Sequence, residues 1–259
     1  MSDVSVNPSP LRVAALIPAY QAAPHLGEVL MRLAALDPAP DVLVVDDGSR
    51  DATAEIARRH GARVLRFAAN RGKGHALLAG FRELAGYDAV VALDADGQHP
   101  PETFPRFVEA AATADVVLGR RRFGTGMPPS RRLANVFSSR WASLAAGQRI
   151  SDSQCGYRLY RSEVLRLVPV TPSRYEVESE MAVRAARLGF RVAEIEIPTV
   201  YGDETSHVSL HFDVPRILGT LARMSLEALA PPAEMRHARR VRDTRALTRD
   251  VAAGEAASR

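Results

Sequence analysis

Two carboxylates one residue apart, Asp94 and Asp96, directly follow the apolar run 89–93. A buried parallel strand that ends in such residues places them at the carboxyl edge of its sheet, where open α/β folds bind ligands. Side chains two positions apart in a strand point the same way, so both carboxylates can meet one cation. Mg²⁺ or Mn²⁺ takes one or two carboxylates and completes its shell with substrate phosphates. Gln98 has the same parity, so Asp94, Asp96 and Gln98 are the candidate metal ligands.

Short polar clusters follow the other predicted strands, and in a parallel sheet they converge on the edge that carries Asp94 and Asp96. Side chains with a purely structural role would be scattered over both ends of the sheet, so this convergence is more specific than any single motif. Asp46 and Asp47 suit hydrogen bonds from a nucleotide base or ribose, or a role as a helix cap. The clusters are Pro18-Ala19-Tyr20, Asp46-Asp47-Gly48-Ser49 and Asn70-Arg71-Gly72-Lys73-Gly74.

Lys73 is the single lysine among 34 Lys and Arg residues. Either the composition is biased toward arginine, or this position needs a compact ammonium rather than a planar guanidinium. The glycines beside it permit close approach of the backbone to a phosphate, although the spacing is not that of a P-loop. The chain also lacks the glycine fingerprint after its first strand, which disfavours a dinucleotide-dependent oxidoreductase.

Hydrophobic periodicity predicts strands that alternate with helices of about ten residues in the first half of the chain, the pattern of a parallel sheet with right-handed crossovers. We therefore predict an α/β fold with a mostly parallel central sheet flanked by helices. The predicted strands are 12–18, 41–45, 64–67, 89–93, 116–119, 157–160 and 191–197. The predicted helices are 25–35, 52–60, 75–84, 133–146, 162–167, 177–188 and 215–229.

The chain has 259 residues, of which 46% are hydrophobic and 25% charged, and these values fit one globular domain. The single cysteine, Cys155, excludes an internal disulfide and favours a reducing compartment. No run approaches the roughly 18 apolar residues that span a bilayer, and the polar start lacks the core of a signal peptide. We predict a disordered N-terminus over 1–10, one domain over 11–230 and an Arg-rich mobile tail over 231–259.

The net charge of +4 is concentrated near the C-terminus, because residues 231–259 hold seven Arg against four Asp and Glu, or +3. The rest of the chain is nearly neutral, which disfavours a nucleic-acid-binding face. The amphipathic helix over 215–229 and the basic tail could dock at an anionic membrane surface. Alternatively, the helix completes the core and the tail is solvated. The predicted location is the cytoplasm, with peripheral contact at the inner face of the membrane through 215–259 as an option.

Five motifs in a fixed order resemble family-2 glycosyltransferases, most closely their polyprenyl-phosphate sugar synthase branch, which is similar to dolichol-phosphate mannose and glucose synthases. The motifs are Pro18-Ala19-Tyr20, Asp46-Asp47-Gly48-Ser49, Gly72-Lys73-Gly74, Asp94-Ala95-Asp96-Gly97-Gln98-His99-Pro100 and Ser153-Gln154-Cys155-Gly156-Tyr157-Arg158. The resemblance implies a GT-A fold, a GDP- or UDP-hexose as nucleotide-diphospho-sugar donor, a divalent metal and inversion at the anomeric carbon. It covers the chain from residue 13 to about residue 229.

The resemblance also implies roles for individual residues. It assigns the base and ribose pocket to Pro18, Ala19, Tyr20, Asp46 and Asp47, with Lys73 close by. It assigns the metal and the donor diphosphate to Asp94, Asp96 and Gln98, and the sugar side to Gln154. An acceptor phosphate is assigned to Arg120, Arg131 and Arg132. One departure follows the last predicted strand, where His207 stands after Ser206 in place of the expected lysine. His207 can still donate a hydrogen bond to a donor phosphate.

These residues predict transfer of a hexose to a polyprenyl-phosphate-type acceptor. A phosphate acceptor is already ionised at neutral pH and needs arginines to position it more than a general base. The same fold with a glycan or small-molecule hydroxyl as acceptor would need a base, with Asp96, Glu176, Glu178 or Glu180 as candidates. Glu178 and Glu180 lie near a predicted helix start, which favours interaction with the helix dipole instead. A nucleotidyltransferase acting on sugar phosphates is a further alternative, but the loop 18–23 has neither glycine nor cation.

Overall fold

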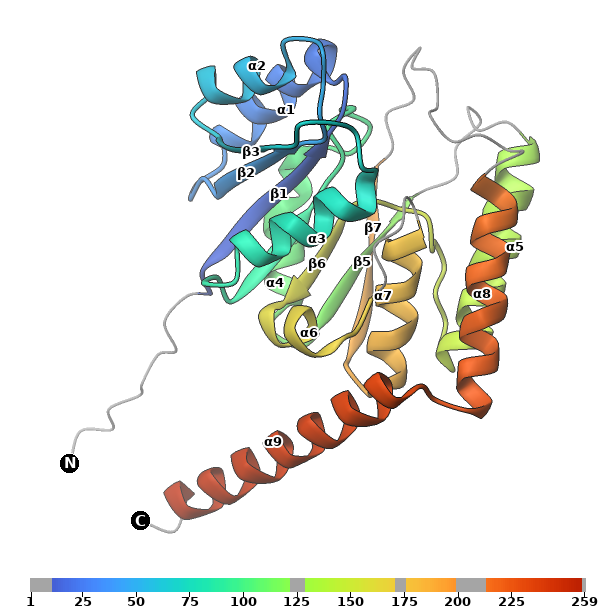
Figure 1. Ribbon diagram of the computed structural model, residues 1–259. Helices are drawn as coiled ribbons and strands as arrows, with labels where there is room; N and C mark the ends of the chain where they lie inside the picture. The colour runs from blue at the N-terminus through green and yellow to red at the C-terminus, as the bar shows by residue number, and fades with distance from the viewer. Residues whose placement is uncertain (1–10, 122–128, 171–175, 199–212, 258–259) are drawn as a thin grey trace, which may run out of the picture.

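The computed structural model describes residues 11–121, 129–170, 176–198 and 213–257, which fold around a seven-stranded sheet of order β3-β2-β1-β4-β6-β5-β7. Neighbouring strands are parallel except at β6, which is antiparallel to both β4 and β5. The predicted mostly parallel α/β sheet is therefore confirmed (Figure 1). The strands are β1 Val13–Ala19, β2 Asp41–Asp46, β3 Arg63–Arg66, β4 Ala89–Ala92, β5 Val116–Arg121, β6 Arg158–Arg161 and β7 Val192–Ile197.

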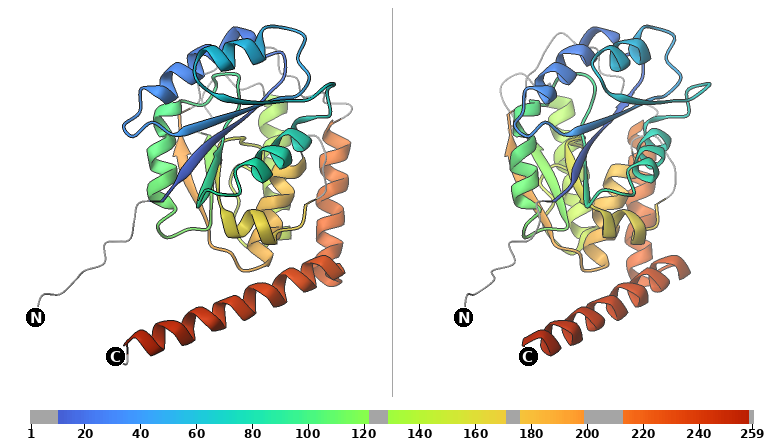
Figure 2. Two further views of the ribbon diagram at one scale, coloured as in Figure 1. Left: turned by 60° about the vertical axis from the view of Figure 1, so that its left-hand side comes forward. Right: turned by 90° about the vertical axis from the view of Figure 1, so that its left-hand side faces the viewer.

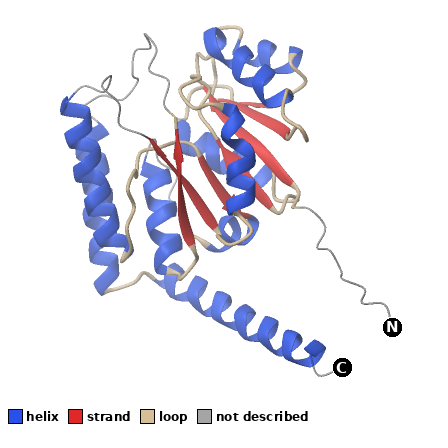
Figure 3. Cartoon of the chain, turned by 180° about the vertical axis from the view of Figure 1, so that it is seen from behind, coloured by secondary structure: helices blue, strands red, loops and turns tan. Residues whose placement is uncertain are grey.

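Helices cover both faces of the sheet, as the view from behind shows (Figure 3). One face packs against α1 Ala23–Ala34, α2 Thr53–Arg59, the 3₁₀ turn η1 Pro101–Thr103 and α4 Phe104–Ala110. The other face packs against α3 Lys73–Glu83, α5 Pro129–Ala146, α6 Ser162–Leu167 and α7 Glu176–Arg187. Helix α8, Asp213–Leu229, packs on α5 and α7, and α9, Ala233–Ala257, follows it. No helix of these described residues is long and apolar enough to cross a membrane.

The central strands are apolar throughout because both of their faces are covered. In β1, Leu16 points into the core under α3 and α7, whereas its neighbour Ile17 points into the core under α1 and α4. Both residues are fully buried. The register pairs Leu16 with Leu43 of β2 and Ala92 of β4, so the ends of these parallel strands meet at one edge.

The predicted strands and helices are all present, most of them with bounds that differ by one or two residues. The largest difference is at α5, which begins at Pro129 rather than at residue 133. Proline is well suited to the first turn of a helix, where its missing N–H would have no partner. Arg120 and Arg121 lie beyond the predicted strand 116–119. They extend β5 because they pair with Glu196 and Ile197 of β7.

Residues 233–257, in the Arg-rich tail that the sequence predicts to be mobile or loosely helical, form helix α9. The first turns of α9 bury Met235 and Ala238 against the domain. Arg239 donates to the carbonyl of Arg187, the last residue of α7, and Arg242 donates to the carbonyl of Gly189 just beyond it. Helix α9 thus supplies a hydrogen-bond donor at the C-terminal end of α7, where carbonyl groups lack intrahelical partners. Figures 1 and 2 place it below the sheet, at the edge opposite the carboxyl ends of the parallel strands.

Gly48, which follows β2, allows the loop after β3 to pass close to the carboxyl edge. It has a φ of +75°, and a Cβ atom there would lie 2.5 Å from the backbone carbon of Ala69. Gly61 has nearly the same φ, +76°, with nothing within 4 Å of its Cβ position.

We expect Gly61→Ala to lower the free energy of unfolding by about 1 kcal/mol for the left-handed backbone alone. Gly48→Ala should lower it by about 1–3 kcal/mol more because of the clash. Urea unfolding of both variants measures this difference, and equal losses would contradict it.

Candidate active site

Three elements place Lys73, Asp94 and Glu178 in contact at the carboxyl edge of the sheet. Lys73 is the first residue of α3, Asp94 lies just beyond β4, and Glu178 is in the first turn of α7. The Lys73 ammonium lies 2.6 Å from Oδ1 of Asp94 and 3.2 Å from Oε1 of Glu178. One compact cation therefore bridges two carboxylates, a geometry that suits an ammonium better than a planar guanidinium.

The charges of this cluster stabilise one another. Burial by itself opposes the charged form of Lys73, but the carboxylates of Asp94 and Glu178 outweigh it and raise the pKa of Lys73. Burial also opposes ionisation of Asp94, yet the nearby ammonium lowers the pKa of Asp94 below its usual value. At neutral pH the cluster therefore contains a charged ammonium and an ionised Asp94.

Gly156 lies directly behind the Asp94 carboxylate. A Cβ atom on Gly156 would lie 2.3 Å from Oδ2 of Asp94, so only glycine lets the chain before β6 come this close. The glycine of the Gln154-Cys155-Gly156-Tyr157-Arg158 segment is therefore part of the wall that orients Asp94.

The alternation of side chains along a strand predicts Asp94 and Asp96 on one strand face. This prediction is wrong, because β4 ends at Ala92 and the two residues lie in the turn that follows. Oδ1 of Asp96 accepts a hydrogen bond from the backbone N–H of Gln98 at 3.0 Å, and Gly97 has a φ of +75°. This local turn, rather than strand geometry, determines the direction of the Asp96 carboxylate.

The oxygen atoms of this turn fit a hard divalent cation. Asp94 and Asp96 are both half-buried; Oδ1 of Asp94 contacts the Lys73 ammonium, and Oδ1 of Asp96 accepts from the N–H of Gln98. Among the described residues no group of three or more His, Cys, Asp or Glu could hold a metal ion. Two carboxylates such as those of Asp94 and Asp96 are the usual protein contribution to a Mg²⁺ site, whose shell substrate phosphates complete.

Asp46 and Asp47, predicted to line a base and ribose pocket, lie buried at the end of β2 and organise the loops of this edge. Asp46 accepts from the N–H of Ser49 at 2.9 Å and pairs with Arg66 at 3.0 Å. Asp47 accepts from the N–H groups of residues 71 and 72, each at 2.7 Å. Asp47 therefore fixes the loop that leads to Lys73.

The remaining predicted residues lie in several places. Pro18 and Ala19 are buried at the end of β1, and Tyr20 beside them is 45% exposed, which leaves its ring available at this edge. Gln154 donates to Oγ of Ser179 in α7 at 3.2 Å. His207 lies outside the described residues.

Arg120 lies at the same carboxyl edge, because β4 and β5 are both antiparallel to β6. Its guanidinium forms an ion pair of 2.9 Å with Glu196 of β7, and the two side chains are 41% and 40% exposed. Arg131 and Arg132 belong to the first turn of α5, but their side chains lie outside the described part of the structure.

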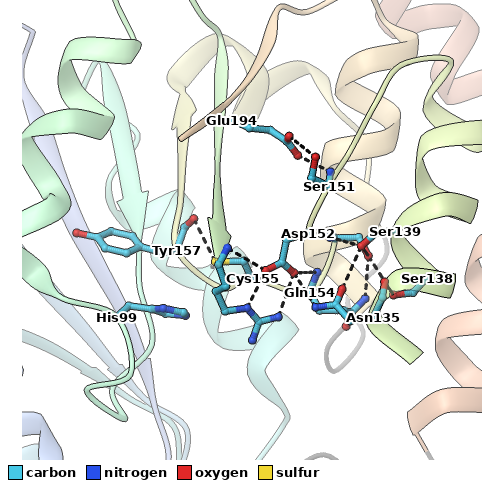
Figure 4. A network of polar contacts seen from close by, with 12 residues as sticks. His99, Asn135, Ser138, Ser139, Ser151, Asp152, Gln154, Cys155, Tyr157 and Glu194 are labelled. Carbon is cyan, nitrogen blue, oxygen red and sulfur yellow. Dashed lines mark hydrogen bonds and ion pairs between the residues drawn. The ribbon is translucent and has the colours of Figure 1, made fainter. Parts of the chain in front are cut away.

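A buried polar network supports the segment that carries Gln154 and Gly156 (Figure 4). Asp152 accepts from Arg121 at 2.7 Å, from Asn135 at 3.1 Å and from the N–H of Gln154 at 3.2 Å. Burial opposes its charge, but the hydrogen bonds and positive charge of Arg121 lower the pKa of Asp152.

Arg158, 1% exposed, completes this support from inside the fold. It donates to the carbonyls of Ser153 and Cys155, each at 2.6 Å, and to that of Glu178. One guanidinium thus ties the turn before β6 to the start of α7. The sequence signal for this network is Arg158, a charged residue in the otherwise apolar predicted strand 157–160.

His99 is a further member of the site. It belongs to the motif of residues 94–100, but the sequence predicted no role for it. It is 4% exposed, its Nε2 lies 4.0 Å from Oδ2 of Asp94, and its ring lies beside that of Tyr157 with centroids 5.9 Å apart (Figure 4). Burial lowers the pKa of His99 to about 4, so the imidazole is neutral at physiological pH. Glu178, for which the sequence favoured a helix-dipole role, is buried and paired with Lys73.

An acidic turn and a lysine at the carboxyl edge of a mixed α/β sheet define the class of GT-A glycosyltransferases. Residues 14–168 match the profile of glycosyl transferase family 2, and the chain belongs to that family. The predicted fold and enzyme class are both confirmed.

Two curated relatives resemble most of the chain. An undecaprenyl-phosphate mannosyltransferase from Micrococcus luteus is 38% identical over 204 residues, which cover 73% of this chain and 84% of the relative. A polyprenol monophosphomannose synthase from Mycolicibacterium smegmatis is 34% identical over 205 residues, which cover 72% of this chain and 76% of the relative.

The fold is shared with a solved structure of glucosyl-3-phosphoglycerate synthase from Mycobacterium tuberculosis in complex with Mn²⁺, UDP and glucosyl-3-phosphoglycerate. The TM-score is 0.70 at 21% sequence identity, and the alignment covers 83% of this chain and 80% of the other. The same enzyme has also been solved with Mg²⁺ and UDP, at a TM-score of 0.69 and 21% identity over 83% and 79% of the two chains.

The neutral state of His99 makes the stability of the metal-free protein depend on pH. The unfolded chain binds a proton near the ordinary value of 6.5 and the folded chain only near 4, so the stability present above pH 6.5 is lost as the pH falls toward 4. Between about pH 7 and about pH 5 we expect a loss of about 2 kcal/mol from this residue. Urea unfolding of wild type, His99→Gln and the exposed control His60→Gln measures it. The same pH dependence in all three proteins would rule out His99 as its source.

Proposed function

We propose that this protein is an inverting, metal-dependent glycosyltransferase that moves a hexose from a nucleotide-diphospho-sugar to a polyprenyl-phosphate-type lipid. The observation that carries the proposal is the acidic turn of Asp94 and Asp96, with Lys73 held against Asp94 at 2.6 Å. The undecaprenyl-phosphate and polyprenol relatives support the lipid acceptor. The Mn²⁺ and Mg²⁺ complexes of the structural neighbour support the divalent cation.

In this proposal the donor diphosphate lies over the turn at the end of β4. Asp96 holds the metal, with Gln98 as a further oxygen ligand, and Asp94 is oriented by Lys73 and Gly156. A bound Mg²⁺ or Mn²⁺ supplies positive charge that stabilises the leaving diphosphate. Pro18, Ala19, Tyr20, Asp46 and Asp47 border the base and ribose, and Gln154 and His207 border the rest of the donor.

The acceptor phosphate needs position rather than deprotonation, because it is already anionic at neutral pH. Arg120, at the carboxyl edge of the sheet, and Arg131 supply the guanidinium groups that bind phosphate oxygens in a bidentate manner. Direct displacement then requires only that the acceptor oxygen lie in line with the departing diphosphate. The lipid is reached from the cytoplasmic face of the membrane by peripheral contact.

The donor half of the proposal predicts that nucleotide binding depends on both metal and Asp96. With GDP-mannose or UDP-glucose, we expect Mn²⁺ to raise the melting temperature for one donor only, because a ligand stabilises the state that binds it. Asp96→Asn removes this shift and lowers the transfer rate at least about a hundredfold, the effect of losing one oriented charge at a transition state. Thermal shift and turnover of radiolabelled donor are the measurements.

Asp243→Asn, an exposed position of α9, serves as the matched control for this experiment. A shift that is unaffected by metal and by Asp96→Asn would contradict the donor site. A shift for neither donor would contradict the glycosyltransferase mechanism in this form.

The acceptor half predicts a separate effect at Arg120. For Arg120→Ala, we expect KM for a short-chain polyprenyl phosphate to rise about tenfold or more, because a charge-assisted hydrogen bond is worth about 1.5–3 kcal/mol. KM for the donor stays the same. Steady-state kinetics with each substrate varied separately measures both values. Arg106→Ala is the control, since Arg106 of α4 is exposed and donates to the backbone carbonyl of Glu196 rather than to its carboxylate. A rise in donor KM alone would contradict this role.

A further inference from the structure

A cleft of about 950 Å³ lies between α5, the segment after it and the strands β5 and β7. Four of its lining residues share one face of α5, because positions three and four apart in a helix are neighbours. They are Val136, Arg140, Ser143 and Leu144. Arg149 lies in the segment after α5, and Arg120 and Glu196 line the cleft from the sheet side. The cleft therefore extends from the carboxyl edge of the sheet along the outer face of α5.

The charges in this cleft do not cancel. Arg120 is paired with Glu196 at 2.9 Å and Arg121 with Asp152 at 2.7 Å. Arg140 and Arg149 are exposed, and neither has an acidic partner within the part of the chain that the structure describes. Two uncompensated guanidinium groups therefore give the cleft a net positive charge and hydrogen-bond donors suited to phosphate oxygens.

Apolar side chains stand beside these cations. Leu144 is 83% exposed and Val136 is 41% exposed, although the same helix buries Ala142 and Ala145 in the domain. Leaving a leucine in water forfeits the free energy that its burial would contribute. Guanidinium groups next to exposed aliphatic side chains match an anionic head group attached to an apolar chain.

We propose that this cleft binds the head group of a phosphate-bearing lipid at a membrane surface, with Arg140 and Arg149 contacting the phosphate and Val136 and Leu144 contacting the start of the apolar chain. A polyprenyl phosphate and an anionic phospholipid both carry this chemistry. Arg140 and Arg149 lie outside the residues proposed for the transfer reaction, but Arg120 lines the same cleft, so for a polyprenyl phosphate the inference deepens the proposed function and rests on it.

Helix α9, which carries six arginines against four acidic residues, is less suited to this role. Its Arg239 and Arg242 already donate to carbonyls at the end of α7, and the Arg242 guanidinium lies over the Phe190 ring at 4.8 Å. It also lies at the edge of the sheet opposite the candidate active site (Figures 1 and 2). A membrane bound at the α5 cleft lies instead next to Arg120, which also belongs to the proposed acceptor site.

The test is sedimentation of the full-length protein with three kinds of vesicle: phosphatidylcholine alone, the same lipid with phosphatidylglycerol, and the same lipid with a small fraction of polyprenyl phosphate. The variant is Arg140→Glu with Arg149→Glu. Its matched control, Arg58→Glu with Arg82→Glu, changes the net charge equally at exposed positions of α2 and α3. Leu144→Ser tests the apolar contact without a change in charge. Thermal melting and donor binding, measured on every variant, keep loss of fold and failure of the proposed transferase separate from loss of the lipid site.

We expect wild type and the control pair to bind anionic vesicles and not phosphatidylcholine alone. The double Arg140/Arg149 variant should bind them at least about thirtyfold more weakly, since each arginine near an anionic surface contributes about 1 kcal/mol. Leu144→Ser should weaken binding severalfold. Binding to both anionic mixtures identifies a general anionic-lipid site, whereas binding to polyprenyl phosphate vesicles alone identifies the acceptor lipid. Equal losses in the control pair, or no binding of wild type to either anionic vesicle, would overturn the proposal.

Discussion

The contact of the Lys73 ammonium with Asp94 and Glu178 is the interaction on which the candidate site depends. Each partner comes from a different element, and without the cation two carboxylates would face one another in a largely buried position, where like charges disfavour ionisation. The cluster joins α3, β4 and α7 at the carboxyl edge, on the face of the sheet whose core these helices share. The ion pair therefore positions Asp94 and fixes the first turns of α3 and α7 relative to the sheet.

The other buried charges extend this constraint to the segment before β6. Burying ions is costly, and Asp152 and Arg158 are tolerated because each is surrounded by partners that satisfy its hydrogen-bonding groups. Their partners hold the chain from residue 152 to 158 against α7. Gly156 can then lie directly behind Asp94. The Lys73 ammonium and the Gly156 backbone thus orient Asp94, and the neutral imidazole of His99 lies 4.0 Å from the same carboxylate.

Local patterns predicted most of the fold, because strands covered on both faces are continuously apolar and the helices between them are amphipathic. They could not predict the direction of β6, since a short apolar strand has the same pattern in either orientation. The parity rule was wrong for Asp94 and Asp96 because β4 ends two residues before Asp94 and a turn follows. Composition does not reveal that Met235 and Ala238, in the tail 231–259, are buried against the domain.

The sequence by itself determined the α/β class, the family and the edge of the sheet where the chemistry lies, because these follow from periodicity and from short motifs in order. Only the tertiary structure decided which charges meet. Lys73 and Glu178 are 105 positions apart, and their contact depends on how α3 and α7 pack, which no local pattern encodes. The same holds for the α5 cleft, whose arginines and leucine are ordinary surface residues until β5 and β7 supply the opposite wall.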